Sequence, residues 1–186
     1  TEATRDYLKS LNIIDKKKLK LLRDPVIDVS KFSKKNLKYK DDIFEEKSYY
    51  LAIGRLTRQK NFLFLCECFK EILKIYPDEK LLIAGEGEDK SKLENFIKKN
   101  ELEKNIFLIG YKKEILKYLY NSKGFILSSL WEDPGFVLIE AAMTRTFIMS
   151  SDCSNGPREI IKDGHNGILF ENGNKEIFLK KFEIFK

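Results

Sequence analysis

The chain has 186 residues, 42% of them hydrophobic, and a formal net charge of +6. This length suffices for one domain with a packed core and a piece of another, and the composition excludes an intrinsically disordered chain. No apolar run approaches the roughly 20 residues that cross a bilayer, and no basic-then-apolar leader opens the sequence, so we expect neither a transmembrane helix nor a signal peptide.

The positive charge is concentrated at the start of the chain. Residues 1–40 carry 12 Lys/Arg against 5 Asp/Glu, and the remainder carries 23 against 24. A solvated face is the commoner explanation of such a segment, and contact with anionic lipid or nucleic acid is the alternative. Because neither interleaved aromatic residues nor a nucleic-acid motif accompanies the charge, we expect no nucleic-acid partner.

Two other features concern the compartment and the completeness of the chain. Cys66, Cys68 and Cys153 form no CxxC pair, so we expect reduced, buried thiols in a cytoplasmic protein. The first residue is Thr1 rather than Met, which suggests that the chain was cut from a longer protein.

In chain order, two short elements come first. Apolar residues at helical spacing predict the end of a helix at residues 2–14, and an apolar run predicts a short strand at 19–22. The segment 23–28, Arg-Asp-Pro-Val-Ile-Asp, precedes a Lys-rich polar stretch that predicts a linker or exposed loop. We therefore divide the chain into residues 1–28, a linker at 29–48 and a main domain at 49–186.

Strands and helices alternate in the main domain. Apolar runs predict strands at 49–53, 80–84, 105–109, 124–127, 147–150 and 167–170, and helical periodicity predicts helices at 62–76, 90–99, 113–121 and 135–143. Such alternation implies right-handed crossovers and an open parallel sheet with helices on both faces. The predicted fold class is therefore α/β and Rossmann-like, with ligands bound at the carboxyl ends of the strands.

One stretch, residues 128–143, joins a predicted strand to a helix through Pro134 and Gly135. The first N–H groups of a helix attract anions, and Gly135 lets a phosphate approach closely. Glu132 precedes the helix and Glu140 lies inside it, and a carboxylate can accept two hydrogen bonds from a diol. A nucleotide-sugar would fit this arrangement; a solvated turn followed by a core helix is the alternative.

Loops after the first three predicted strands also carry polar groups or glycines. Arg55 and Lys60 could together neutralise a diphosphate, although two surface cations would look the same. The glycine-containing loop at residues 84–88 lacks the third glycine of the dinucleotide pattern, which argues against a nicotinamide cofactor. The third strand ends in Gly110 and Tyr111.

Together these motifs resemble the retaining family 4 glycosyltransferases, which have the two-domain GT-B fold. Glu132 and Glu140 look like the family's Glu-x7-Glu motif, and residues 54–61 resemble its Gly-Arg-Leu-x-x-x-Lys-Asn string. Residues 156–160, Gly-Pro-Arg-Glu-Ile, resemble the family's Gly-x-x-Glu-Ile segment. This form of it is similar to that of members that transfer sugars in the assembly of bacterial surface glycans and lipid-linked oligosaccharides. Residues 23–28 resemble the family's interdomain Asn-Pro-Val-Asp, with Asp24 in place of Asn, so the resemblance covers about residues 15–175.

The resemblance implies that the main domain is the donor-binding half of a GT-B fold and that residues 1–28 end the acceptor domain. It implies that Arg55 and Lys60 hold the donor diphosphate, Glu140 the ribose and Glu132 the transferred sugar, with Arg55, Lys60 and Glu132 acting in catalysis. The donor-binding residues that it implies are Gly54, Arg55, Lys60, Gly85, Gly110, Tyr111, Glu132, Gly135, Phe136 and Glu140.

The implied activity is transfer of a sugar, with retention, from a nucleoside-diphosphate-sugar (UDP-linked in our expectation) to a glycan or lipid-linked acceptor. No metal or other cofactor is expected. The N-terminal acceptor domain that the resemblance places before this fragment is an implied partner, and we expect the fragment alone to be inactive. The implied location is the cytoplasm, at the inner face of the membrane. A non-catalytic nucleotide-sugar-binding module is the alternative.

Two departures from the family pattern are visible. Arg145 and Phe147 stand where the family usually has Gly and Pro, which puts the local turn in question. Glu132 is followed by Asp133 and Pro134 rather than by Gly-Phe, which could shift the contacts to the transferred sugar.

Overall fold

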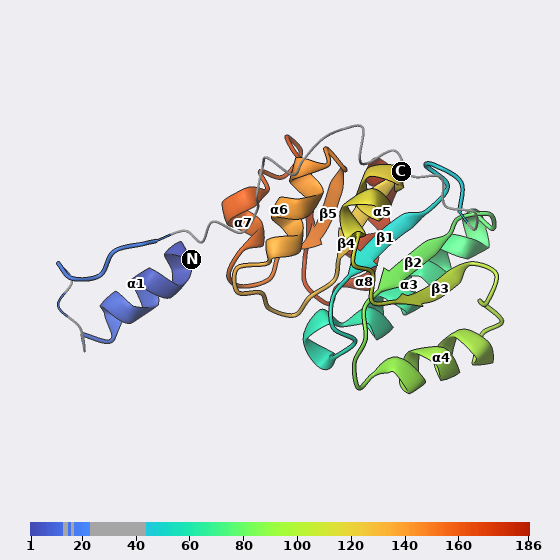
Figure 1. The fold of residues 1–186 in the computed structure, drawn as a ribbon, viewed down its shortest axis with the longest axis horizontal. Coiled ribbons are helices and arrows are strands. Elements are labelled where there is room, and N and C mark those ends of the chain that lie inside the picture. Colours follow the sequence, from blue (N-terminus) through green and yellow to red (C-terminus); the bar gives the residue numbers. More distant parts are fainter. Residues whose placement is uncertain (13–14, 16, 23–43) are drawn as a thin grey trace.

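A six-stranded parallel sheet forms the main domain and confirms the predicted α/β class (Figure 1). The computed structural model describes residues 1–12, 15, 17–22 and 44–186. The strands are β1 (Tyr50–Ile53), β2 (Leu81–Ala84), β3 (Ile106–Gly110), β4 (Gly124–Leu127), β5 (Ile148–Ser151) and β6 (Ile168–Phe170). Their limits lie within one residue of the predicted ones.

The strand order is β3-β2-β1-β4-β5-β6, and Tyr50 of β1 lies opposite Leu81 of β2 and Gly124 of β4. Because neighbouring strands are parallel, all carboxyl ends lie at one edge of the sheet. The chain leaves β3 at the margin and returns to the other side of β1, so the strand order reverses between β1 and β4. Such a switch point opens a crevice at the carboxyl ends of the strands, where ligands of α/β sheets bind.

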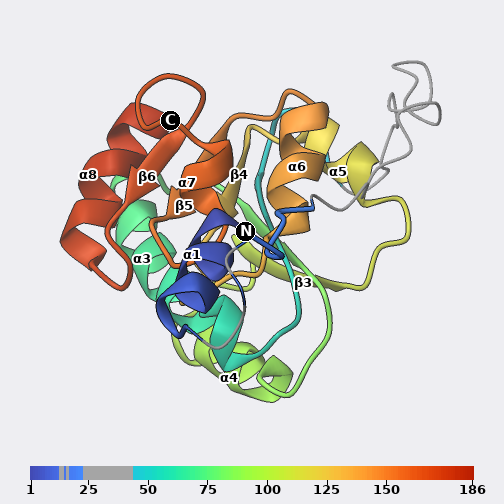
Figure 2. The same ribbon diagram turned by 90° about the vertical axis from the view of Figure 1, so that its left-hand side faces the viewer.

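Helices cover both faces of this sheet, as Figure 2 shows. Helices α3, α4 and α8 pack on one face, and α5 and α6 on the other. Tyr50 and Ala52 of β1 belong to the first core, whereas Leu51 belongs to the second. Burial of both faces explains the continuous apolar runs. The helical elements here are η2 (Arg58–Lys60), α3 (Phe62–Ile75), α4 (Lys90–Lys99), α5 (Ile115–Asn121), α6 (Phe136–Met143), α7 (Pro157–Ile160) and α8 (Lys175–Phe185).

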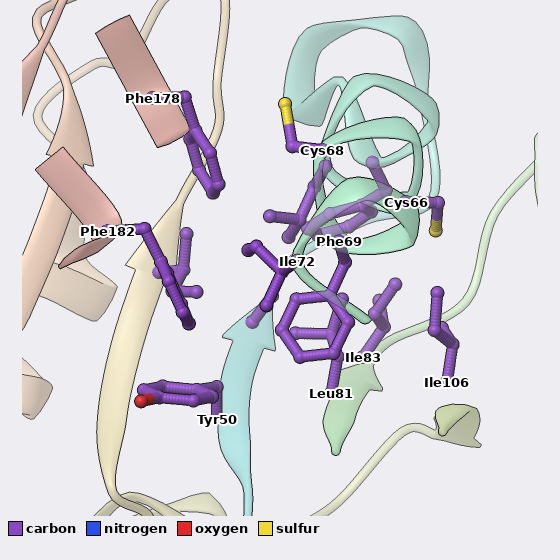
Figure 3. Packing of buried hydrophobic residues seen from close by; sticks show 14 of the residues in the cluster. Tyr50, Cys66, Cys68, Phe69, Ile72, Leu81, Ile83, Ile106, Phe178 and Phe182 are labelled. Atoms are coloured by element: carbon purple, nitrogen blue, oxygen red, sulfur yellow. The ribbon is translucent and has the colours of Figure 1, made fainter. Parts of the chain in front are cut away.

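The first core contains a cluster of aromatic rings, part of which Figure 3 shows. Tyr50 and Phe182 pack edge to face with ring centroids 5.1 Å apart, and Phe178 and Phe182 project from α8 toward α3 and β1. Helix α8 is absent from the helices predicted above, although its phenylalanines recur at helical spacing. Asn174 caps α8 by accepting from the N–H of Ile177 at 3.1 Å, so the cap and the periodicity are both in the sequence.

The start of the chain agrees only in part with the expectation. Helix α1 (Glu2–Ser10) confirms a helix at the start of the chain, but it is shorter than predicted: residues 11 and 12 form a turn, and residues 13 and 14 lie outside the described residues. The strand predicted at 19–22 is wrong, because these residues form no regular element and Leu22 is exposed. A strand requires a hydrogen-bonded neighbour, and within the described residues none pairs with this segment. Residues 23–28 and most of the linker at 29–48 lie outside the description.

Three further expectations concern single residues or segments. Cys66, Cys68 and Cys153 are free and buried as predicted, and burial raises the pKa of the Cys66 and Cys68 thiols to about 12. Arg145 has a φ of 57°, a left-handed conformation that favours glycine, so the turn forms without it. No helix within the described ranges combines the length and apolar character needed to cross a bilayer.

Candidate functional site

A cavity of about 510 Å³ opens at the carboxyl ends of β1, β2 and β3. It lies at the edge of the sheet where ligands of α/β folds bind, on the β2 side of the switch point between β1 and β4. Five of the predicted donor-binding residues line it: Gly54, Arg55, Gly85, Tyr111 and Glu140. Gly110 lies at the same edge, where its carbonyl oxygen accepts from the N–H of Gly85 at 2.9 Å. Residues from three strand ends and from helix α6 therefore share one cavity.

Glycines form part of this cavity because backbone packs directly on backbone. Gly54 and Gly85 have φ values of 155° and 145°, which residues with a side chain rarely adopt. A Cβ at Gly85 would lie 1.9 Å from the carbonyl oxygen of Gly54. A Cβ at Gly54 would lie 2.8 Å from Cε of Lys60, so the Lys60 side chain runs directly over Gly54. The missing side chain at Gly54 thus leaves the space that the predicted functional cation Lys60 occupies.

Lys60 and Glu132 form an ion pair beside the cavity. Their Nζ and Oε1 atoms are 2.5 Å apart, and their side chains are only 13% and 4% exposed. The hydroxyl of Ser129, which is also buried, donates to the same Oε1 atom at 2.5 Å. The family resemblance implies roles for Lys60 and Glu132 at different parts of a donor, and their direct contact is not predictable from it.

Hydrogen bonds tie the loop after β1 to the loop after β4. The N–H of Leu130 donates to the Gln59 carbonyl at 2.8 Å, and the Gln59 side chain donates to the Trp131 carbonyl at 3.0 Å. The Ser128 hydroxyl donates to the Lys60 carbonyl at 2.8 Å. Gln59, Ser128 and Ser129 thus hold the site together through hydrogen bonds, although none of them is among the site residues predicted from the sequence. Only their place inside the two motifs could have indicated them.

Gly135 and Phe136 lie at the start of α6 but do not line the cavity. Gly135 is the N-cap residue with a φ of 81°, and its carbonyl accepts from the N–H of Leu138 at 2.9 Å. Phe136 is 39% exposed and lines a smaller cavity of about 180 Å³ with Pro134 and Ile139. The start of α6 and its interior thus face different surroundings: Phe136 lines the smaller cavity, and Glu140 lines the cavity of about 510 Å³.

Arg55 and Glu140 are the two predicted charged residues that line the cavity of about 510 Å³, together with Glu86, Lys112 and Lys113. The Arg55 guanidinium is exposed and lies 3.4 Å from the Gln59 side-chain oxygen. Glu140 is partly buried, and this burial raises the pKa of its carboxyl group above the ordinary value. A carboxylate that is held without a strong ionic partner is suited to accept hydrogen bonds from a hydroxylated ligand.

We expect Glu140→Gln to be more stable than the wild type near pH 7. Because burial raises the pKa of Glu140, the folded state holds this proton more tightly than the unfolded state does. The wild type should therefore lose stability as pH rises from about pH 4 through the folded pKa, whereas the uncharged glutamine should not. Urea unfolding of both proteins across this range measures the difference.

Glu176→Gln serves as the control, because Glu176 is exposed and pairs with Lys180. Lys180 lowers the pKa of Glu176, so removal of this charge should not stabilise the protein at neutral pH. A Glu140→Gln variant less stable than the wild type near pH 7 would contradict the expectation.

The parallel sheet, its switch-point cavity and the charged groups around glycine turns define an α/β ligand-binding domain of the kind that forms half of a GT-B glycosyltransferase. A family model makes this specific: "Glycosyl transferases group 1" matches residues 33–185. The chain belongs to this family.

Two curated relatives illustrate the match. An uncharacterised glycosyltransferase of Methanocaldococcus jannaschii is 42% identical over 120 residues, which are 64% of this chain and 30% of the relative. The second, from Campylobacter jejuni, is N-acetylgalactosamine-N,N'-diacetylbacillosaminyl-diphospho-undecaprenol 4-alpha-N-acetylgalactosaminyltransferase. It is 31% identical over 162 residues, which are 87% of this chain and 42% of the relative.

A similar solved structure is that of a mutant of S. aureus TarM in complex with fondaparinux, alpha-GlcNAc-glycerol and UDP. It matches with a TM-score of 0.73 and 29% identity over 97% of this chain and 35% of that one. This chain therefore spans less than half of each of these three proteins.

Proposed function

We propose that this chain contains the donor-binding half of a retaining family 4 glycosyltransferase. The full-length enzyme would transfer a sugar from a UDP-linked donor to a glycan or lipid-linked acceptor. The observation that carries this proposal is the cavity at the strand ends, which holds Arg55 and Glu140 and adjoins the Lys60–Glu132 pair. The UDP in the TarM complex and the diphospho-undecaprenol in the name of the Campylobacter relative support the choice of donor and acceptor.

Each charged group has a role that its chemistry permits. Arg55 would bind the donor diphosphate through its guanidinium fork, and Lys60 would add a second cation. Glu140, in the larger cavity, would accept hydrogen bonds from the ribose diol, and Glu132 would accept them from the transferred sugar. As the bond to the sugar breaks, charge grows on the diphosphate, and the two cations would stabilise this leaving group without a metal ion.

Lys60 can serve the diphosphate without leaving the site. An ammonium group has three N–H donors, and only one is needed for the contact with Glu132. Lys60 would therefore be shared between the Glu132 carboxylate and a phosphate oxygen. This sharing would link the diphosphate end of the donor to the residue that holds its sugar.

Location and partners follow from the proposed acceptor. A lipid-linked acceptor places the enzyme at the inner face of the cytoplasmic membrane, where the basic first 40 residues would contact anionic lipid. GT-B catalysis occurs between two domains, so we propose that this chain alone binds donor weakly and transfers no sugar. A non-catalytic nucleotide-sugar-binding module remains the alternative, and sugar transfer by the full-length protein would exclude it.

Saturation-transfer NMR of this chain with the common UDP- and GDP-sugars tests donor binding. Signal from a UDP-sugar is expected, and Arg55→Ala should weaken binding of free UDP by about 1.5–3 kcal/mol through loss of a charge-assisted contact. Arg58→Ala is the matched control, because Arg58 is an exposed arginine of η2 that does not line the cavity. Equal UDP affinity in wild type and Arg55→Ala would contradict the assignment of Arg55.

A further inference from the structure

Ser129 lies directly in contact with the proposed sugar-binding carboxylate. It follows β4 and is fully buried, and its hydroxyl donates to Oε1 of Glu132 at 2.5 Å. The same oxygen receives the ammonium of Lys60 at 2.5 Å. Two donors from different loops therefore set the position of one carboxylate oxygen.

The two donors differ in how firmly they are held. Lys60 reaches Glu132 with a long side chain that has several rotatable bonds. Ser129 has a short side chain, and its backbone carbonyl accepts a 2.7 Å hydrogen bond from the hydroxyl of Ser151 on β5. Ser151 is itself fully buried within the sheet. The position of Ser129 is therefore determined by the core, whereas the Lys60 ammonium is held at the end of a long side chain.

This difference matters when a donor binds. A diphosphate oxygen would compete with Glu132 for the Lys60 ammonium and would weaken its hold on the carboxylate. Ser129 contacts no proposed ligand group, so its hydrogen bond would persist. Both contacts fall on Oε1 of Glu132, and among the described residues no hydrogen bond to Oε2 is found, so Oε2 would accept from a sugar hydroxyl.

We propose that Ser129 is a positioning residue that keeps the Glu132 carboxylate oriented toward the transferred sugar while Lys60 is shared with the donor diphosphate. This inference rests on the proposed function and adds to it the residue that sets sugar orientation. It requires that Ser129 affect binding of the sugar moiety and not binding of the nucleotide.

Calorimetry with UDP and with UDP-N-acetylglucosamine separates these two effects. In Ser129→Ala, affinity for the nucleotide-sugar should fall about tenfold, as expected for loss of a hydrogen bond to a charged group. Affinity for free UDP should change less than about twofold, because UDP lacks the sugar. Ser129→Thr keeps the hydroxyl and should restore most of the lost affinity.

Ser150→Ala is the matched control. Ser150 is as fully buried as Ser129, but its hydroxyl donates to the carbonyl of Ser151 at 2.9 Å and not to Glu132. This variant should bind both ligands as the wild type does, and thermal melts of all variants verify that each protein is folded.

Several outcomes would overturn the proposal. Equal losses for UDP and the nucleotide-sugar in Ser129→Ala, or the same losses in Ser150→Ala, would make Ser129 a purely structural residue. Unchanged binding of both ligands in Ser129→Ala would show that Ser129 has no role in binding. A wild type that binds UDP-N-acetylglucosamine no more tightly than UDP would also contradict the proposal, because the sugar would then contribute nothing to affinity. A wild type that binds neither ligand would instead refute the proposed function from which this inference starts.

Discussion

Replacing Lys60 with Ala should lower the free energy of unfolding by about 3 kcal/mol, because it leaves the buried Glu132 carboxylate without its cation. Glu132 is only 4% exposed, so water cannot readily replace the lost partner. The Ser129 hydroxyl still donates to Oε1 and should offset part of the cost. Urea unfolding of Lys60→Ala and wild type, monitored by circular dichroism, measures the change.

Two further variants make this result specific. The double variant Lys60→Met/Glu132→Gln removes both charges and should recover most of the lost stability. Lys90→Ala breaks a surface pair with Glu86, in which both side chains are about half exposed, and should cost less than about 1 kcal/mol. If Lys60→Ala costs no more than Lys90→Ala, the Lys60–Glu132 pair does not behave as a buried ion pair.

Gly85→Ala should destabilise the fold by about 3–5 kcal/mol, the largest effect we expect from a single added methyl group. The new Cβ would lie 1.9 Å from the carbonyl oxygen of Gly54, and the φ of 145° is unfavourable for alanine. Relief of the clash requires a shift of the loops after β1 and β2, which are the loops that line the candidate cavity.

Gly173→Ala separates the clash from the backbone strain. Gly173 has a φ of 73°, but a Cβ there would meet no atom within 4 Å. This variant should cost only the left-handed conformation, about 1–2 kcal/mol. The two free energies of unfolding are compared by urea titration, and equal losses would show that the approach of Gly85 to Gly54 is not limiting.

The strands and most helices were predictable because their signals are local. Buried parallel strands require continuous apolar runs, so the positions of these runs in the sequence predict the limits of β1 to β6 to within one residue. The same reasoning failed at 19–22, where an apolar run has no strand beside it within the described residues. Helix α8 could have been found, since Asn174 and the spacing of its phenylalanines are ordinary helix signals.

The fold class and the order of the strand-end motifs are predictable from the sequence alone. The sequence also suffices to predict that Gly54, Arg55, Gly85 and Tyr111 meet at one edge of a sheet. Parallel strands impose this, because their carboxyl ends coincide wherever the strands lie in the chain. The contact of Lys60 with Glu132, and that of Ser129 with the same carboxylate oxygen, become visible only in the folded protein. The Lys60–Glu132 contact joins residues 72 positions apart, and it depends on the path of two loops and on the space left by the missing Cβ at Gly54, which no local pattern encodes.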